Sequence, residues 1–167
     1  KAGFSLSVYN RTPEKVKDLA AEGASVCSSP RELAEQVDVI FTNVTDTPDV
    51  RAVLFGRDGV VEGCREGQIV IDNSTISPRE TREIAKILAE KGAAFLDAPV
   101  SGGDIGAQKG TLSIMVGGDK AVFEACLPYF QAMGSTITWC GESGMGQMTK
   151  LCNQILCAVN MVATCEC

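Results

Sequence analysis

The chain contains no histidine among its 167 residues. Histidine is the commonest general acid–base and a frequent metal ligand, so its absence excludes Ser-His-Asp and Cys-His triads together with histidine metal sites. Any proton transfer must then use lysine, aspartate, glutamate, cysteine or tyrosine. The eight cysteines include no CxxC pair. We therefore expect no metal site, and we predict small buried thiols in a reducing compartment, either the cytoplasm or an organelle matrix.

Positive charge and long apolar runs are also scarce. The 15 lysines and arginines are outnumbered by 21 aspartates and glutamates, which gives a net charge of −6. This balance excludes the basic footprint of a nucleic-acid-binding protein. No run approaches the roughly 18 apolar residues of a membrane span. With 45% hydrophobic and 22% charged residues the composition is ordinary for a globular domain, so neither nucleic acid nor a membrane is expected as a partner.

Short apolar runs alternate with helix-start signals along the first two thirds of the chain. Ser29, Ser77, Thr12 and Thr47 are each followed directly by proline, the arrangement of an N-cap with proline at the first helical position. Alternating strands and helices predict a parallel sheet with right-handed crossovers, that is, a Rossmann-like, doubly wound, mostly parallel α/β fold. The runs between the helices are continuously apolar, as in strands covered on both faces; they are residues 37–42, 69–72 and 94–96.

The last third of the chain predicts two more strands and two helices. Residues 112–116 and 136–140 are expected as strands, and Pro128 should bend or divide the helix between them. A long apolar stretch without turn signals then predicts a helix that is still running at the last residue. We expect a dinucleotide-binding domain at 1–141, and at 142–167 the beginning of an interdomain helix that leads into an all-helical C-terminal domain.

The first strand of a dinucleotide fold should lead into a G-x-G-x-x-G turn, which places a pyrophosphate at a helix N-terminus. No such turn occurs before residue 4. We therefore interpret residues 4–9, where Phe4, Leu6 and Val8 alternate with serines, as the second strand of the fold. The expectation is a longer polypeptide, with a further βα unit before these residues and a helical domain after them.

The end of this strand indicates which cofactor is used. An acidic residue at this position binds the ribose hydroxyls of NAD, whereas an arginine suits the 2′-phosphate of NADP. Here Asn10 is neutral, Arg11 is cationic and Thr12 adds a hydroxyl. The triplet therefore favours NADP, because an acidic residue would repel the additional phosphate. Alternatively, Thr12 only caps a helix and Arg11 is a solvated charge, and the two interpretations are compatible.

Two later strands also end in polar or glycine-rich residues. Thr75 follows the run at 69–72 and could offer its hydroxyl to a ligand, or form a local turn before the next helix. Ser101, Gly102 and Gly103 follow the run at 94–96. Two residues without Cβ let a ligand approach the backbone N–H groups, although an ordinary glycine-rich connection has the same composition.

A second glycine-rich cluster, at 141–153, leads into the last helix. Lys150 and Asn153 lie three residues apart and so on one face of that helix. The face is otherwise apolar, and a lysine there is costly unless it is paired or has a chemical role. The alternative for an isolated residue is a surface lysine near the start of a helix.

Three motifs together resemble the β-hydroxyacid dehydrogenase family, and the likeness extends over essentially the whole chain. They are DAPVSGG at 97–103, GTLSIMVGGD at 110–119 and GxxGxGxxxKxxN at 141–153. The resemblance implies an oxidoreductase that transfers hydride between NADP(H), with NAD possible, and a small carboxylate-bearing 3-hydroxy acid or semialdehyde acid. Substrates of this kind are 3-hydroxyisobutyrate, tartronate semialdehyde, glyoxylate and succinic semialdehyde.

The resemblance also implies roles for individual residues. Lys150 would be the catalytic residue, Ser101, Gly102 and Gly103 would hold the substrate carboxylate, and Asn153 would bond to the substrate. No metal would be needed, and the whole protein would be a homo-oligomer formed through its C-terminal domain.

For the cofactor, the resemblance implies that Thr75 lies near the nicotinamide and that the triplet at 10–12 is of the NADP-preferring kind. Asn43, Val44 and Thr45 stand where the family has Met-Leu-Pro, and we expect cofactor contacts from Asn43 and Val44 despite the change.

Two alternatives differ in function. A non-catalytic relative could keep the fold as a nucleotide-binding or oligomerisation module, but it would not need Lys150. A 6-phosphogluconate dehydrogenase would resemble this chain in architecture, but it would require a histidine next to the catalytic lysine.

Overall fold

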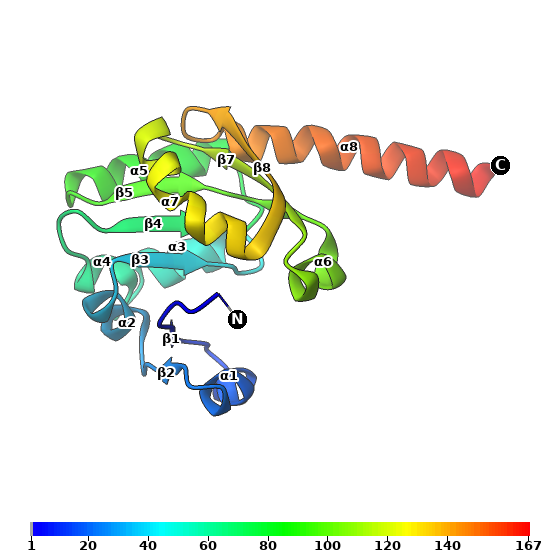
Figure 1. The fold of residues 1–167 in the computed structure, drawn as a ribbon. Helices are drawn as coiled ribbons and strands as arrows, with labels where there is room; N and C mark the ends of the chain where they lie inside the picture. The colour runs from blue at the N-terminus through cyan, green and yellow to red at the C-terminus, as the bar shows by residue number, and fades with distance from the viewer. Residues whose placement is uncertain (1) are drawn as a thin grey trace.

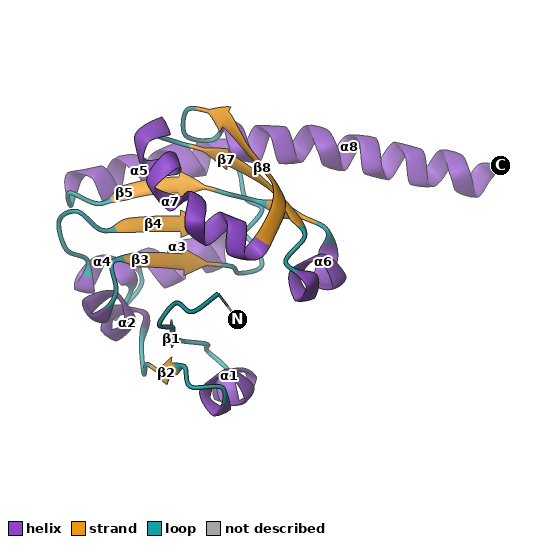
Figure 2. Ribbon diagram, in the orientation of Figure 1, coloured by secondary structure: helices purple, strands orange, loops and turns teal. Residues whose placement is uncertain are grey.

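A computed structural model describes residues 2–167 and shows an open sheet with helices on both faces, followed by one long helix (Figures 1 and 2). In chain order the elements are β1 (Ser7–Val8), the 3₁₀ helix η1 (Pro13–Val16), α1 (Lys17–Ala21), β2 (Ser25–Val26), α2 (Pro30–Gln36), β3 (Val39–Thr42), α3 (Thr47–Phe55), α4 (Val60–Gly63), β4 (Ile69–Asp72), α5 (Pro78–Glu90), β5 (Ala94–Asp97), β6 (Val100–Ser101), α6 (Gly103–Lys109), β7 (Leu112–Gly117), α7 (Lys120–Met133), β8 (Gly134–Gly141) and α8 (Met145–Glu166).

The main sheet has the strand order β3-β4-β5-β7-β6, with β8 paired to β7. β3, β4 and β5 run parallel, and Val39 is level with Ile69, which is level with Ala94. β7 runs antiparallel to β5 and β6 but parallel to β8. The predicted Rossmann-like, mostly parallel α/β sheet is therefore confirmed.

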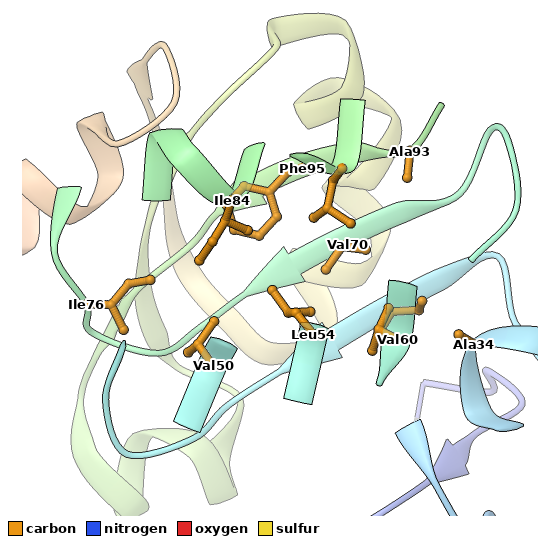
Figure 3. Close-up of a cluster of buried hydrophobic side chains, with 11 residues drawn as sticks. Ala34, Val50, Leu54, Val60, Val70, Ile76, Ile84, Ala93 and Phe95 are labelled. Carbon is orange, nitrogen blue, oxygen red and sulfur yellow. The ribbon is translucent and has the colours of Figure 1, made fainter. Parts of the chain in front are cut away.

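Each face of the sheet has its own apolar core. On one face, side chains from α2, α3, α4 and α5 pack against β3, β4 and β5; Figure 3 shows Val50, Leu54 and Ile84 around Val70. On the other face, α7 packs Phe130 and its neighbours against β5 and β7. Strands covered on both faces are buried on both sides of their pleat, which explains their continuously apolar sequences.

The N-terminal strand is shorter than predicted. Only Ser7 and Val8 of residues 4–9 form a strand, which pairs in parallel with β2 in a separate two-stranded sheet. Phe4 and Leu6 are 50% and 52% exposed, so the alternating apolar side chains are not buried as in a packed strand. Within residues 2–167 no ladder joins β1 to β3.

The helix starts confirm some of the predicted caps and correct others. Ser29 Oγ accepts from the backbone N–H three residues later at 3.0 Å, as expected. α3 is capped by Asp46 rather than by the threonine after it. Thr12 and Ser77 make no side-chain cap bond, although each is followed by a proline at the first position of its helix, as Ser29 is.

α7 runs unbroken through Pro128, so the expected division of this helix is wrong. A proline removes one backbone hydrogen bond, but Phe123, Cys126 and Phe130 bury one face of the helix against the sheet on either side of it. The packing of this face keeps the helix continuous.

α8 lies against the sheet only at its start. From Leu151 onward nearly every side chain is exposed, and in Figure 1 the helix projects away from the sheet. Cys152, Cys157, Cys165 and Cys167 are exposed there, and only Cys27 and Cys126 are buried, so the prediction of buried thiols is mostly wrong. No helix within residues 2–167 combines the length and apolarity that crossing a membrane requires. The large apolar side chains that α8 exposes from Leu151 onward are Leu151, Ile155, Leu156, Val159, Met161 and Val162.

The start of α8 approaches β7 closely because both backbones have glycine at the contact. A Cβ built on Gly117 would lie 2.7 Å from Gly146 N and 2.6 Å from Asp97 Oδ1. A Cβ on Gly146 would meet Met115 O and would lie 2.8 Å from Asp97 O. The helix can therefore lie on this part of the sheet only if neither residue carries a side chain.

This contact gives a first prediction. Gly146→Ala in the full-length protein should lower the free energy of unfolding by at least about 2 kcal/mol, because a methyl group cannot fit without moving the backbone. Urea unfolding measures the change. Gly23→Ala is the control: it also adds a methyl group, but nothing lies within 4 Å, so only the strain of its φ of +100° remains. Equal losses from the two changes would contradict the close packing of α8.

Candidate functional site

β3, β4 and β5 end on one side of the sheet, here called the carboxyl edge (Figure 1). Asn43 and Val44 follow β3 at this edge, and residues 74–76, here called the Thr75 loop, follow β4. Val44 N–H donates to Ser74 Oγ at 2.9 Å and so joins the two loops. Thr75 is exposed while Ser74 and Ile76 on either side are buried. Thr75 is therefore accessible at this edge, and a contact between its hydroxyl and a ligand stays a prediction.

Further side-chain hydrogen bonds fix these loops to the strands. Thr42 Oγ1 donates to Asp72 Oδ1 at 2.8 Å, and Ser74 N–H donates to the same oxygen at 3.1 Å. Asn73 Nδ2 donates to Ala98 O at 2.7 Å, which connects the end of β4 to the end of β5. The carboxyl edge is therefore an ordered polar surface above an apolar sheet.

Two buried carboxyl groups lie side by side at this edge. Asp72 and Asp97 are paired in register on β4 and β5, and both are fully buried. Burial raises the pKa of Asp72, hydrogen bonds from Ser74 and Thr42 oppose the shift, and the nearby Asp97 charge adds to it. Within residues 2–167 Asp72 Oδ2 has no hydrogen-bond partner. Burial also raises the pKa of Asp97, against backbone hydrogen bonds from α8.

Asp97 holds the start of α8. Its Oδ1 accepts from Gly144 N–H at 2.7 Å and its Oδ2 accepts from Gln147 N–H at 2.9 Å. These N–H groups belong to the first turn of the helix, which has no partners of its own, and their partial positive charge favours a carboxylate. Gly144, the N-cap, has a φ of +88° that suits glycine. α8 is thus attached to the end of β5 by a side chain from the DAPVSGG motif.

Lys150 lies on the same face of α8 as this attachment. The buried residues of the helix are Gly146, Gln147 and Lys150, which fall within about one turn of one another. Lys150 is only 8% exposed, and no ion pair involves it among the described residues. Asn153 follows on the same face and is half-buried. A largely buried lysine without a carboxylate partner is the strongest sign of chemistry in the chain.

Ser101, Gly102 and Gly103 form the corner between β6 and α6. Ser101 is level with Ser113 of β7, and Gly102 and Gly103 have φ values of +132° and +63°. Both glycines are exposed, which leaves the backbone of the corner open to a ligand. α6 was not predicted; α6 and the first turn of α8 lie on the side where β3, β4 and β5 end (Figure 1).

The triplet at 10–12 lies in the loop after β1, apart from the main sheet. Asn10 Oδ1 accepts from Thr12 N–H at 2.8 Å, which orders the loop. The Arg11 side chain is 88% exposed, and its Nη1 is 3.8 Å from Asp49 Oδ1 at the start of α3. An exposed ion pair of this length contributes little energy and leaves the guanidinium free to bind an anion.

These residues fit a dinucleotide better than a metal ion. Exposed donors at the triplet, an exposed hydroxyl at Thr75 and an open backbone at the glycine corner suit phosphates, hydroxyls and carboxylates. Between residues 2 and 167 no three metal-binding side chains converge.

Sequence reasoning missed three residues of this site: Asp72, Asp97 and Gln147. The partners of Asp97 and Gln147 on α8 and in the Thr75 loop are 47 to 73 residues away, so no local pattern could show them. The available signal was an acidic residue that ends each of two apolar strands, at positions where burial would demand hydrogen-bond partners.

The chain is similar to known proteins in sequence and in fold. The family model of the NAD binding domain of 6-phosphogluconate dehydrogenase matches residues 1–141. The 2-hydroxy-3-oxopropionate reductase of Escherichia coli (strain K12) is 46% identical over 99% of this chain and 56% of its own length. Mycobacterium tuberculosis 3-hydroxyisobutyrate dehydrogenase, solved with L-serine, is 34% identical with a TM-score of 0.93, over 99% of this chain and 56% of that one.

A further solved structure, Psf3 in complex with NADP+ and 2-OPP, is 29% identical with a TM-score of 0.92, over 98% of this chain and 58% of that one. The chain therefore spans little more than half the length of these relatives.

The buried Asp72 gives a second prediction. Because its pKa is raised on folding, its contribution to stability is complete below the ordinary value of 3.8 and is lost as pH rises through the folded value. Asp72→Asn should therefore become more stable relative to the unchanged protein as pH rises from about 4 to 7. The gain in the free energy of unfolding should be about 1.4 kcal/mol for each unit by which folding raises the pKa of Asp72. Denaturant unfolding at several pH values measures the difference. Because an unpaired amide adds a constant offset, the test is the slope, and parallel curves would contradict it.

Proposed function

Because the chain belongs to the β-hydroxyacid dehydrogenase family, we propose that the whole protein transfers hydride between NADP(H) and a small 3-hydroxy acid or semialdehyde acid. The observation that carries this proposal is Lys150, which is largely buried on the attached face of α8 and has no ion pair among residues 2–167. The L-serine found with the M. tuberculosis relative is itself a 3-hydroxy acid, which supports the substrate class.

Lys150 is the proton donor in the proposed reaction. When bound, the reduced nicotinamide supplies a hydride to the carbonyl carbon of the semialdehyde. Lys150, as an ammonium group, stabilises the negative charge that grows on the carbonyl oxygen and donates a proton to it. In the reverse direction the neutral amine of Lys150 takes the proton from the hydroxyl group.

The glycine corner is the proposed carboxylate site. Ser101 offers a hydroxyl, and the open backbone at Gly102 and Gly103 offers N–H groups to an anion. Asn153, one turn beyond Lys150 on the same face of α8, would bond to the substrate. A short acid held in this way would have its carbonyl carbon near the lysine.

The cofactor is proposed to be NADP rather than NAD. Arg11, with Asn10 and Thr12 beside it, provides charge and donors for a 2′-phosphate, and the triplet itself carries no carboxylate. The Asp49 carboxylate, 3.8 Å from Arg11 Nη1, is the acidic group near it. The Psf3 structure, a neighbour at 29% identity, was solved with NADP+. Asn43 and Val44 would contact the cofactor from the loop after β3, and Thr75 would lie near the nicotinamide.

A non-catalytic module is the second candidate. It would bind the nucleotide or assemble subunits, but it leaves the burial of an unpaired Lys150 without a purpose. A 6-phosphogluconate dehydrogenase activity fits less well, since a histidine beside the lysine would be required and the chain has none.

We also infer how the whole protein is organised. The exposed apolar side chains of α8 beyond Leu151 support a second, helical domain that packs on this interdomain helix, and assembly into a homo-oligomer through that domain.

Eight free cysteines support a reducing compartment, either the cytoplasm or an organelle matrix.

Substitution of Lys150 tests the proposed chemistry. Lys150→Ala in the full-length protein should lower turnover by a factor on the order of 10² to 10⁴, because both the proton and the charge that stabilises the oxyanion are lost. Lys150→Arg should also be slow, since a guanidinium keeps its proton near neutral pH. Single-turnover NADPH oxidation at saturating substrate measures the rate. Retention of more than roughly a tenth of the original rate by Lys150→Ala would show that the lysine is not the proton donor.

Ser101→Ala is the matched contrast to Lys150→Ala. It should mainly raise the KM for the acid, because it removes a hydrogen bond to the carboxylate and leaves the proton donor in place. A fall in kcat as large as that of Lys150→Ala would contradict the separate roles.

Substitution of Arg11 tests the cofactor preference. Arg11→Asp should weaken NADPH binding at least about tenfold more than NADH binding, because it replaces a phosphate partner worth about 1.5–3 kcal/mol with a like charge. Titrating each cofactor by its fluorescence gives the two dissociation constants. Equal weakening of both would show that Arg11 acts only on the local fold.

A further inference from the structure

We propose that Gln147 is a positioning residue that fixes Lys150 relative to the Thr75 loop, and this inference rests on the proposed role of Lys150. Gln147 is fully buried and is three residues before Lys150 in α8. Its hydrogen-bond partners are Ser74, Ile76 and Asp97, none of which is proposed to bind the substrate or the cofactor. Gln147 would therefore act only through the elements that it joins.

The Gln147 side chain joins α8 to the Thr75 loop. Its Nε2 donates to Ser74 O at 2.7 Å, and its Oε1 accepts from Ile76 N–H at 3.1 Å. One amide therefore satisfies the backbone on both sides of Thr75. Among the hydrogen bonds of residues 2–167, these two are the ones that connect α8 to this loop.

Gln147 is also held through its backbone. Its backbone N–H donates to Asp97 Oδ2 at the end of β5, while its side chain reaches the loop after β4. The bond to Asp97 fixes where α8 begins, and the bonds to the Thr75 loop fix how the helix is rotated about its axis. Lys150 lies three residues later on the same face, so that rotation sets the direction of its side chain.

The consequence concerns the reaction. Thr75 is the proposed neighbour of the nicotinamide and Lys150 is the proposed proton donor, so the amide of Gln147 sets the distance between the hydride site and the proton site. A displacement of about 1 Å in such a geometry can lower a rate by about 10²-fold. The simpler interpretation is that Gln147 only satisfies buried backbone groups and stabilises the fold.

The chain contains a matched control for that interpretation. Gln68 is also buried. Its Nε2 donates to Ala34 O at 2.6 Å and to Val37 O at 2.5 Å, and its Oε1 accepts from Arg65 N–H at 2.6 Å. It joins α2 to the loop before β4, at the opposite end of that strand from the Thr75 loop. Removing either amide leaves comparable backbone groups unpaired, but only Gln147 lies between Thr75 and Lys150.

The experiment compares Gln147→Met and Gln68→Met in the full-length enzyme. It uses NADPH with whichever of glyoxylate and tartronate, succinic and methylmalonic semialdehydes the unchanged enzyme reduces fastest. Both should lower the Tm. Gln147→Met should lower kcat by about 10- to 100-fold while the KM for the acid changes less than about threefold. Gln68→Met should keep kcat within about twofold. A kcat within twofold of the unchanged enzyme for Gln147→Met, or equal losses of kcat from both variants, would overturn the proposal.

A double variant separates this inference from the proposed function. If Gln147 acts through Lys150, then Lys150→Ala with Gln147→Met should turn over no more slowly than Lys150→Ala alone. Multiplied losses would overturn the inference and leave the role of Lys150 intact. A nearly unchanged rate for Lys150→Ala would instead overturn the proposed function itself.

Gln147→Glu covers the case in which the methionine variant does not fold. A protonated glutamic acid has the shape of glutamine and can donate to Ser74 O, whereas the ionised form cannot. Its kcat, relative to the unchanged enzyme at each pH, should rise as pH falls. A ratio that does not vary with pH would contradict a positioning role for this amide.

Discussion

The candidate site depends on two hydrogen bonds that the buried Asp97 carboxyl accepts from backbone N–H groups at the start of α8. Both oxygens are used, at 2.7 and 2.9 Å, and the groups that they bind would otherwise be the unpaired first turn of a helix. A carboxyl at the end of β5 therefore decides where α8 starts. Every residue that follows on the buried face of the helix, including Lys150, takes its place from this contact.

The contact is possible only because the backbones can approach each other. Gly117 and Gly146 leave no room for a Cβ at the crossing of β7 and α8, and Gly144 takes up the positive φ at the cap. The glycine pattern of the last motif thus has a packing purpose as well as any ligand-binding purpose. Burying two neighbouring carboxyl groups at the carboxyl edge costs free energy, and the raised pKa of Asp72 reflects that cost.

Much of the fold could be predicted from the sequence because its signals are local. Short-range patterns predict the continuously apolar strands, the N-cap at Ser29 and the placement of Lys150 on one face of α8. The short β1 could not be predicted, since alternation gives no information about whether a packing partner is present. Nor could the exposure of the α8 cysteines, which depends on the helix leaving the sheet near Leu151.

Candidate site residues could be proposed from the sequence, but the hydrogen bonds that join them could not be predicted. Strand ends and helix spacing indicate Thr75, Ser101 and Lys150, and their roles toward a ligand stay predictions. No such pattern indicates Gln147, and the acidic strand end at Asp97 does not reveal the partners of that residue. The partners of both come from distant parts of the chain, up to 73 residues away for Gln147. Long-range hydrogen bonds between buried groups leave no periodic trace in a sequence, although burial demands that they exist.

The central claim is that this polar edge binds a small semialdehyde acid beside NADPH, with Lys150 as the proton donor. It is tested most directly by measuring NADPH oxidation by the full-length protein with glyoxylate and with tartronate, succinic and methylmalonic semialdehydes, against propionaldehyde, which has no carboxylate. The account predicts turnover with at least one of the acids and a far lower kcat/KM for the uncharged aldehyde. Equal rates with the uncharged aldehyde, or no oxidation with any of the acids, would contradict it.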